Sequence, residues 1–268
     1  MIKMIALDLD NTLLTSDKKI SKVNEAELKK LHQQGIKVVL CTGRPINAIW
    51  KYIKQLGLDD PDDYTITFNG GLVVRNTDKH ELFKRGMNRD AFKPLYEYAK
   101  KNVFPLDILD FTQVYPISDL KPSIYQQLLN ADMQFVPTKF SEMPDESYSK
   151  AVIAAEPDVL DRAVKDMPAT VRDHYHIVRS QPKILEFLAP NVDKAYGLGA
   201  LLSHYGDDFS NLMAFGDAEN DAGMIKKAQV GVAMANAQEP IKKIATDVTT
   251  SNDDDGVAAF LQKYFKVK

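Results

Sequence analysis

Short apolar runs alternate with longer amphipathic stretches over the first third of the chain, and this alternation limits the fold more than any other feature. The apolar run at 4–8 is followed by a helix-like segment from Ser21 to Gly35 and then by a second apolar run, KVVLCTG. Continuous apolar strands separated by helices are typical of a parallel sheet that is covered on both faces. The pattern predicts an α/β fold with a Rossmann-like, doubly wound parallel sheet.

The middle of the chain follows a different order. Between about Phe83 and Phe187 it contains two or three amphipathic helices, several prolines and four strand candidates: FTQVYPI, KAVIAAE, YHIVRS and KILEFLA. From Asp193 onward the first pattern resumes. We therefore expect one core, formed by residues 1–83 and 188–268, with an inserted α/β cap domain at residues 84–187.

The charge balance excludes broad classes of partner. The chain of 268 residues has 34 basic and 37 acidic side chains, a formal net charge of −3, so no cationic face for nucleic acid or an anionic membrane is expected. Its single cysteine, Cys41, permits no intramolecular disulfide and suits a reducing compartment. No signal peptide and no apolar stretch of ~20 residues is found. We expect a cytoplasmic protein with a small-molecule partner, and the sequence gives no indication of its oligomeric state.

Polar residues directly follow four of the predicted strands. Because the carboxyl ends of parallel strands meet at one edge of an open sheet, ligand sites form there. We expect the side chains that follow these strands to lie close together. They are Asp8 and Asp10 after the first strand, Thr42 after the second, Asn69 after the third, and Asp217, Asn220 and Asp221 after NLMAFG.

Asp8 and Asp10 are the first candidates for a metal site. Residues i and i+2 of a strand point the same way, so these two carboxylates repel each other unless a cation intervenes. Asp217 offers a further carboxylate at a second strand end. Carboxylates, together with water and phosphate oxygens, are ligands that Mg²⁺ prefers. The alternatives are a solvated pair of turn acids and, for Asp221, an acid stabilised by the helix dipole.

Lys194 and the segment Thr42–Gly43 are candidates for anion binding. Lys194 follows a predicted N-cap, Asp193, in a helix turn where the dipole disfavours a cation, so carboxylates or a bound anion must compensate unless the lysine is solvated. Thr42 and Gly43 form a strand-to-helix junction with a hydroxyl and free N–H groups, which suits an anion but also an ordinary N-cap. Together these groups predict a phosphate site, where one carboxylate can attack phosphorus while its neighbour transfers the proton.

The segments DLDNTLL, CTGRP, VDK and FGDAEND resemble, in this order, the four signature motifs of the haloacid dehalogenase superfamily of phosphatases. The α/β insertion between the second and third motifs resembles the Cof-type branch, which includes many sugar-phosphate phosphatases. The resemblance implies that Asp8 is the nucleophile and Asp10 the general acid/base. It further implies Mg²⁺ ligands and phosphate-binding groups. The Mg²⁺ ligands are Asp8, the backbone carbonyl of Asp10 and Asp217, with Asp221 in the outer shell, and the phosphate is held by Leu9, Thr42, Gly43, Lys194 and Asn220.

Three functions are compatible with these residues. The first is a Mg²⁺-dependent phosphatase that acts on small phosphorylated metabolites, sugar phosphates in particular, through an aspartyl-phosphate intermediate. The second is a sugar phosphomutase with the same core. The third is a non-catalytic, phosphorylated signalling module, which the segment FNGG disfavours because it has no acid after the third strand. The sequence indicates neither the physiological substrate nor the cap residues that select it.

Overall fold

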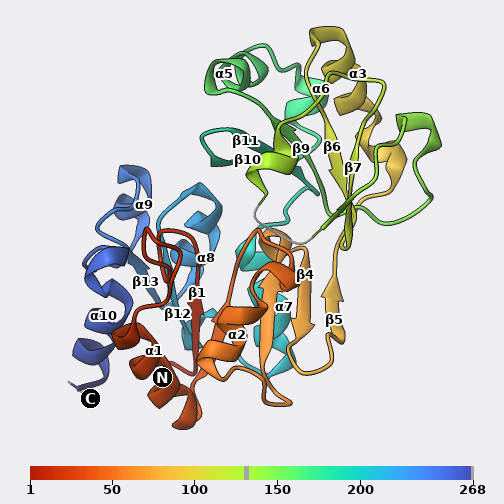
Figure 1. Cartoon of the computed structure of the whole chain (residues 1–268). Coiled ribbons are helices and arrows are strands. Elements are labelled where there is room, and N and C mark those ends of the chain that lie inside the picture. Colours follow the sequence, from red (N-terminus) through yellow and green to blue (C-terminus); the bar gives the residue numbers. More distant parts are fainter. Residues whose placement is uncertain (130–132, 267–268) are drawn as a thin grey trace. The chain divides into compact units, whose positions relative to one another are not determined.

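The computed structural model describes residues 1–129 and 133–266 (Figure 1). Its contacts divide the chain into two compact units, Met1–Lys84 with Asp193–Lys268, and Arg85–Val192. The boundary placed at 187/188 in the sequence falls inside a strand of the second unit, β11 (Ile184–Leu188). None of the helices in the described ranges has both the length and the apolar character that a membrane span requires.

A parallel sheet of five strands forms the centre of the first unit. Its order is β14 (Asp247–Val248), β13 (Val230–Ala233), β12 (Leu212–Gly216), β1 (Met4–Leu7) and β2 (Lys37–Leu40). Every neighbouring pair is parallel. All four residues of β1 are buried, as expected for a strand covered on both faces. The residues that follow β1, β2 and β12 therefore lie at one edge of the sheet.

Alternate residues of β1 belong to two hydrophobic clusters, because successive side chains of a strand point to opposite faces. Ile5 and Leu7 pack in the cluster that includes α1 and α10, whereas Met4 and Ala6 pack in the cluster that includes α7. The sheet is thus doubly wound, which confirms the predicted fold class. The helices of this unit are α1 (Lys22–Gln33), α2 (Trp50–Leu56), α7 (Lys194–His204), α8 (Ala222–Lys227), α9 (Glu239–Ile244) and α10 (Gly256–Lys266).

The predicted third strand leaves the parallel sheet. β3 (Tyr64–Thr67) pairs antiparallel with β4 (Leu72–Arg75), which pairs in turn with β5 (Glu81–Lys84). One bridge between Cys41 and Ile66 ties β3 to the chain just beyond β2. A short apolar run does not reveal whether its partner is parallel or antiparallel, so the sequence indicated this strand but not its hairpin.

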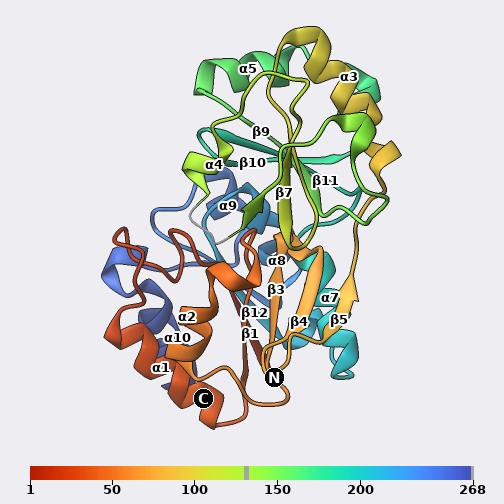
Figure 2. The same cartoon turned by 45° about the vertical axis from the view of Figure 1, so that its right-hand side comes forward.

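The second unit contains a mixed sheet of six strands. Figure 2 shows strands of this sheet together with helices of the same unit. Every pair is antiparallel except β7 with β8. Helices α3, α5 and α6 contribute to the main hydrophobic cluster of this unit, while α4 contributes to a second cluster. In sheet order the strands are β10 (His176–Gln181), β11, β9 (Lys150–Ala154), β6 (Asp107–Leu109), β7 (Gln113–Pro116) and β8 (Gln134–Phe135), and the helices are α3 (Lys93–Asn102), α4 (Tyr125–Leu128), α5 (Pro157–Lys165) and α6 (Ala169–Arg172).

The chain also contains short 3₁₀ turns. Two of them lie near strand ends of the first unit, because η2 follows β3 directly and η6 follows β12 after Asp217 and Ala218. The turns are η1 (Ile46–Ala48), η2 (Phe68–Gly70), η3 (Arg89–Phe92), η4 (Phe140–Glu142), η5 (Phe209–Asn211), η6 (Glu219–Asp221) and η7 (Asn252–Asp254).

Candidate active site

Lys194 joins three distant segments of the chain. It is the first residue of α7, after the N-cap Asp193, whose carboxylate accepts the Tyr196 N–H at 2.7 Å. The ammonium of Lys194 is fully buried and donates to Asp8 and, at 2.6 Å, to Oδ1 of Asp221. The strand-end carboxylates therefore compensate the lysine in the position that the helix dipole disfavours.

The charge of Lys194 is stable in this environment. Burial alone would lower the pKa of its ammonium, but the carboxylates of Asp221 and Asp8 outweigh burial and raise that pKa above its ordinary value. A lysine held charged between two carboxylates is a fixed cation. Such a cation can balance part of the negative charge at this strand edge.

Three buried carboxylates lie close together at this site, and two of them contact Lys194. The carboxylate oxygens of Asp8, Asp217 and Asp221 lie within 4.8 Å of one another. Burial and the neighbouring Asp221 raise the pKa of Asp8 well above its ordinary value, although Lys194 opposes the shift. Burial and Asp221 likewise raise the pKa of Asp217 to about 7. Both acids thus resist ionisation in the protein alone.

The three carboxylates fit a divalent cation. When all are ionised, three negative charges face the one positive charge of Lys194, which leaves an excess of two negative charges. Ligands that are all carboxylate oxygens suit a hard ion such as Mg²⁺. Burial and the repulsion by Asp221 raise the pKa values of Asp8 and Asp217, and an ion of charge +2 would oppose both effects because it favours the ionised carboxylates.

Backbone contacts set the positions of these acids. The Asp8 N–H donates to the Phe215 carbonyl at 3.1 Å, so Asp8 continues β1 beside β12. The Thr12 hydroxyl donates to Asp217 Oδ1 at 3.0 Å. Leu9 lies in the turn between Asp8 and Thr12, and its carbonyl accepts the Leu14 N–H at 2.8 Å. The turn after β1 therefore brings Thr12 back to the residue that follows β12.

Asp221 organises the loop after β12. Its Oδ2 accepts the N–H groups of Asp217 at 2.9 Å and Ala218 at 3.1 Å, while its Oδ1 accepts from Lys194. Gly216 makes this possible, because a Cβ there would lie 2.4 Å from the Cβ of Asp221. Because both of its carboxylate oxygens already accept hydrogen bonds, Asp221 is better suited to orient the residues that bind a metal ion than to bind the ion directly.

The carboxylate of Asp10 has different partners. Arg44 donates to it from Nε at 2.8 Å and from Nη2, and Lys18 donates at 2.9 Å. Burial alone would raise the pKa of Asp10, but Arg44 and Lys18 outweigh burial and hold it below its ordinary value. The idea that the side chains of Asp8 and Asp10 crowd toward one cation is wrong for this structure, because the chain turns after Asp8 and Asp10 pairs with two cations. The Mg²⁺ contact implied by the resemblance uses the Asp10 carbonyl instead.

Thr42, Gly43 and Asn220 all lie next to Asn69, a strand-end residue for which the sequence predicted no specific role. Thr42 Oγ1 accepts the Arg44 N–H at 3.1 Å, as in an ordinary N-cap, and the Thr42 carbonyl accepts the Asn69 N–H at 3.0 Å. The Asn220 amide donates to Asn69 Oδ1 at 3.2 Å. The position of Asn69 at the end of a predicted strand indicated in the sequence that it could lie near the site. No sequence feature indicated that Lys18 pairs with Asp10.

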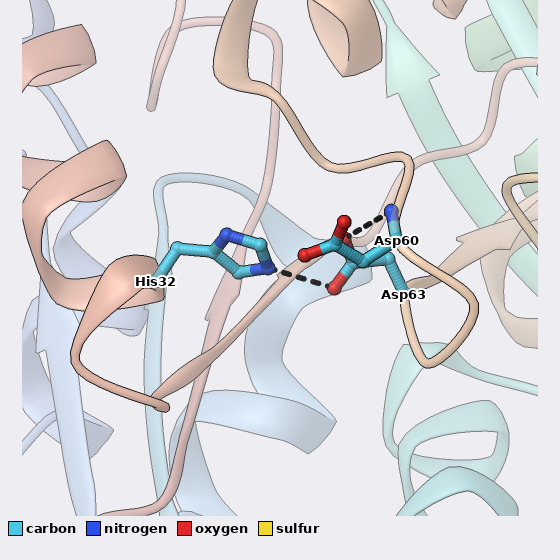
Figure 3. Close-up of side chains that lie close together, drawn as sticks. All are labelled: His32, Asp60 and Asp63. Atoms are coloured by element: carbon cyan, nitrogen blue, oxygen red, sulfur yellow. Dashed lines mark hydrogen bonds and ion pairs between the residues drawn. The ribbon is translucent and has the colours of Figure 1, made fainter.

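A second group of potential metal ligands, His32, Asp60 and Asp63, is explained by structural hydrogen bonds (Figure 3). Nε2 of His32 lies 2.8 Å from Asp63 Oδ1, and the Asp60 N–H donates to Asp63 Oδ2 at 3.0 Å. Both oxygens of the buried Asp63 therefore have partners. The group ties the end of α1 to the turn that precedes β3.

The fold and this set of buried acids define a hydrolase of the haloacid dehalogenase type. The profile of haloacid dehalogenase-like hydrolases matches residues 5–261, and the chain belongs to that family. It is an enzyme, a phosphatase of the Cof-type branch, as the motifs predicted.

Three similar proteins support this assignment. The chain is 34% identical over 265 residues to a Streptococcus pyogenes protein provisionally named as a phosphatase, with 98% of each covered. It is 31% identical over 271 residues to a 5-amino-6-(5-phospho-D-ribitylamino)uracil phosphatase of Bacillus subtilis, again with 98% of each covered. A solved haloacid dehalogenase-like hydrolase from Bacteroides thetaiotaomicron has a TM-score of 0.84 at 31% identity and covers 99% of this chain and 100% of its own.

Proposed function

We propose that the protein is a Mg²⁺-dependent phosphomonoesterase that hydrolyses small phosphorylated metabolites, sugar phosphates and polyol phosphates in particular, through an aspartyl-phosphate on Asp8. The observation that carries the proposal is the buried Lys194, which joins Asp8 to Asp221 beside Asp217. The relative named for 5-amino-6-(5-phospho-D-ribitylamino)uracil supports the substrate class, because that compound presents its phosphate on a polyol chain.

In the first half of the reaction, an oxygen of Asp8 attacks phosphorus and the bond from phosphorus to the leaving oxygen breaks. Asp10 gives its proton to that leaving oxygen. Since Arg44 and Lys18 stabilise the ionised form of Asp10, its carboxyl must leave these two cations before it can act as an acid. In the second half, Asp10 takes a proton from water as the water attacks the phosphoryl group, which frees orthophosphate and restores Asp8.

The remaining groups bind the substrate. Asp8, Asp217 and the Asp10 carbonyl would hold Mg²⁺, with Asp221 behind them, and the ion would neutralise charge on the phosphoryl oxygens. The groups proposed to hold the phosphoryl oxygens are Lys194, the Thr42 hydroxyl, the Leu9 and Gly43 backbone N–H groups and the Asn220 amide. The unit Arg85–Val192 is proposed as the cap that selects the substrate, since the first unit contains all of these residues.

Phosphate release from a panel of phosphorylated sugars, polyols and nucleotides tests the proposal. The wild-type protein with Mg²⁺ should release orthophosphate, and Asp8→Asn should reduce turnover by at least ~10³-fold, because the variant has no nucleophile. Asp78→Asn, at an exposed acid paired with Arg75, is the matched control and should retain activity. Undiminished turnover in Asp8→Asn would contradict the assignment. Isomerised hexose phosphate without released orthophosphate would show a mutase.

A further inference from the structure

The turn between β3 and β4 has a backbone that few sequences adopt. Phe68, Asn69 and Gly70 have φ values of 51°, 53° and 97° in succession, and all three residues are buried. Left-handed φ is uncommon for residues other than glycine and is an outlier for a bulky one such as Phe68. Strained backbone of this kind persists where surrounding contacts hold it, and it is frequent at functional sites.

Asn69 contacts two of the segments that carry proposed phosphate-binding groups. Its N–H donates to the Thr42 carbonyl, and its Oδ1 accepts from the Asn220 amide at 3.2 Å. Its side chain also lies against Gly43, because a Cβ at Gly43 would be 2.9 Å from Asn69 Oδ1 and 3.0 Å from Nδ2. One buried amide thus lies between the segment after β2 and the segment after β12.

Gly70, the next residue of the turn, contacts a third segment that carries a proposed phosphate-binding group, the start of α7 at Lys194. A Cβ at Gly70 would lie 1.9 Å from the Asp193 carbonyl oxygen and 3.2 Å from Cα of Lys194. A Cβ at Gly197 would in turn lie 3.0 Å from Gly70 Cα. The turn therefore packs directly on the start of α7, and Figure 2 shows β3 and β4 beside that helix.

Given the proposed function, on which this step rests, we propose that Asn69 is a positioning residue of the phosphate site: its amide fixes the spacing between Gly43 and Asn220 so that both can contact one phosphoryl group. Three requirements meet at this position. The backbone demands a residue that tolerates left-handed φ, which favours Gly, Asn and Asp. The Asn220 amide needs an acceptor, which Gly lacks. An additional negative charge at this position would repel bound phosphate, which disfavours Asp.

Two variants separate these requirements. Asn69→Gly keeps the backbone conformation accessible and removes the acceptor, and Asn69→Asp keeps the acceptor and adds a negative charge. Loss of the partly buried hydrogen bond from Asn220 should weaken orthophosphate binding about 10-fold in Asn69→Gly. Added like-charge repulsion should weaken it further, about 100-fold, in Asn69→Asp. Mg²⁺ affinity should be unchanged in Asn69→Gly, because the Mg²⁺ ligands are other residues. KM for the hydrolysed substrate should rise alongside the loss of orthophosphate affinity.

The control has the same amino acid at the same kind of backbone position. Asn191 has a φ of 63° in the unit Arg85–Val192, so Asn191→Gly makes an identical change without altering a contact to Thr42, Gly43 or Asn220. A double-mutant cycle adds a second readout, because a residue that acts through Asn220 should have a smaller effect in an Asn220→Ala background. A general loss of packing would give additive effects instead.

Calorimetry measures orthophosphate affinity in the presence of Mg²⁺, and this affinity tests the role of Asn69 independently of catalytic turnover. If the wild-type protein hydrolyses no phosphomonoester, the proposed function fails, and orthophosphate binding that weakens in Asn69→Gly still supports the role of Asn69. Equal orthophosphate affinity in the wild type and both variants overturns the inference while hydrolysis by the wild type leaves the function standing. Absence of orthophosphate binding by the wild type overturns the inference as well.

Discussion

At the scale of single residues, the balance between carboxylates and cations controls the site. Lys194 neutralises only part of the charge of Asp8, Asp217 and Asp221. Burial, together with repulsion by Asp221, therefore raises the pKa values of Asp8 and Asp217. Asp10, by contrast, has two cations of its own and a lowered pKa. Asp8 and Asp10 therefore have opposite electrostatic environments. This difference is compatible with the proposed roles, in which Asp8 is a nucleophile beside a bound metal and Asp10 acts as an acid only after it leaves Arg44 and Lys18.

This balance predicts how stability depends on pH and Mg²⁺. Asp217 has a folded pKa of about 7 against an ordinary value of 3.8, so the folded protein binds more protons than the unfolded chain between these values. In metal-free protein the contribution of Asp217 to stability is therefore present at low pH and is lost as the pH rises toward 7. Mg²⁺ favours the ionised carboxylates, so it should raise the melting temperature more at about pH 8 than at about pH 5.5. Thermal unfolding in EDTA and in Mg²⁺ measures both effects.

The control for this prediction is Asp217→Asn, which has no carboxyl group to titrate at that position. It should reduce both the loss of stability with rising pH and the dependence of the Mg²⁺ effect on pH. A Mg²⁺ stabilisation that is equal at both pH values in the wild-type protein would contradict the prediction.

Asp107 in the second unit predicts a stabilising substitution. It is 1% exposed on β6, and neither carboxylate oxygen has a hydrogen-bond partner among the described residues. Burial raises the pKa of Asp107 to about 7. The nearby Ser123 hydroxyl offsets only part of this rise, and it does not reach hydrogen-bond geometry with either carboxylate oxygen. Removing an unpaired buried carboxylate should raise the free energy of unfolding of this unit by about 1–3 kcal/mol in Asp107→Val at about pH 8. The gain should be smaller at about pH 5.5, where the wild-type carboxyl is protonated.

Asp110 is the matched control for Asp107→Val. It is also a buried acid of the second unit, but its carboxylate accepts the N–H of Gln113 at 2.6 Å and the hydroxyl of Tyr115 at 3.1 Å. Asp110→Val should therefore destabilise the protein, because it leaves these donors unpaired. Urea unfolding of both variants at the two pH values provides the comparison. Equal destabilisation by the two substitutions would show that Asp107 has a partner in solution.

At the scale of elements, the sequence predicted the strand ends well because burial and polarity change within one or two residues there. The run Met4–Leu7 ends at Asp8, and α1 begins after Ser21, whose hydroxyl accepts the Asn24 N–H at 3.1 Å. Partners that are distant in the chain were not predictable in the same way. The pairing of Arg44 with Asp10 depends on how the segment after β2 returns toward β1, and no local pattern encodes that contact.

The hairpin of β3 and β4 was missed for a related reason. An apolar run of four residues fits a parallel or an antiparallel partner equally well. Asn69 and Gly70 tolerate the left-handed turn, but its contacts with Thr42, Asn220 and Asp193 come from distant parts of the chain. Local preference decided the strand, and tertiary contacts decided its partner.

Substitution of Asp63 should reduce the stability of the protein without reducing its proposed activity. Asp63 ties α1 to the turn before β3 (Figure 3), which lies at the amino end of that strand. The proposed site instead follows the carboxyl ends of the strands. Asp63→Ala should reduce the free energy of unfolding by about 1–3 kcal/mol and leave kcat for the proposed reaction within about twofold. Urea unfolding and steady-state kinetics on the same preparation measure the two quantities. Stabilisation by Zn²⁺ that disappears in His32→Ala would show instead that this group binds metal.

At the scale of the whole molecule, each of the two units has its own hydrophobic clusters. All of the proposed catalytic and binding residues belong to the first unit. Ile5, Leu28 and Val38 pack in one cluster of the first unit, while Phe92, Ile108 and Leu160 pack in the main cluster of the second. The sequence could indicate an insertion because the α/β pattern changed and then resumed. It could not place the end of the insertion, because the apolar strand β11 resembles the buried strands of the core.

This division predicts two unfolding transitions, each with its own response. Mg²⁺ with orthophosphate at 100 times its dissociation constant should stabilise the first unit by about 2.7 kcal/mol, because all of the proposed ligands belong to Met1–Lys84 and Asp193–Lys268. Asp107→Val should raise only the other transition, since Asp107 belongs to Arg85–Val192. Differential scanning calorimetry measures the transition temperatures of the wild type and of Asp107→Val, each with and without Mg²⁺ and orthophosphate. If the ligands and the substitution move one common transition, the two units unfold as a single cooperative body, and the energetic independence inferred from their separate clusters is wrong.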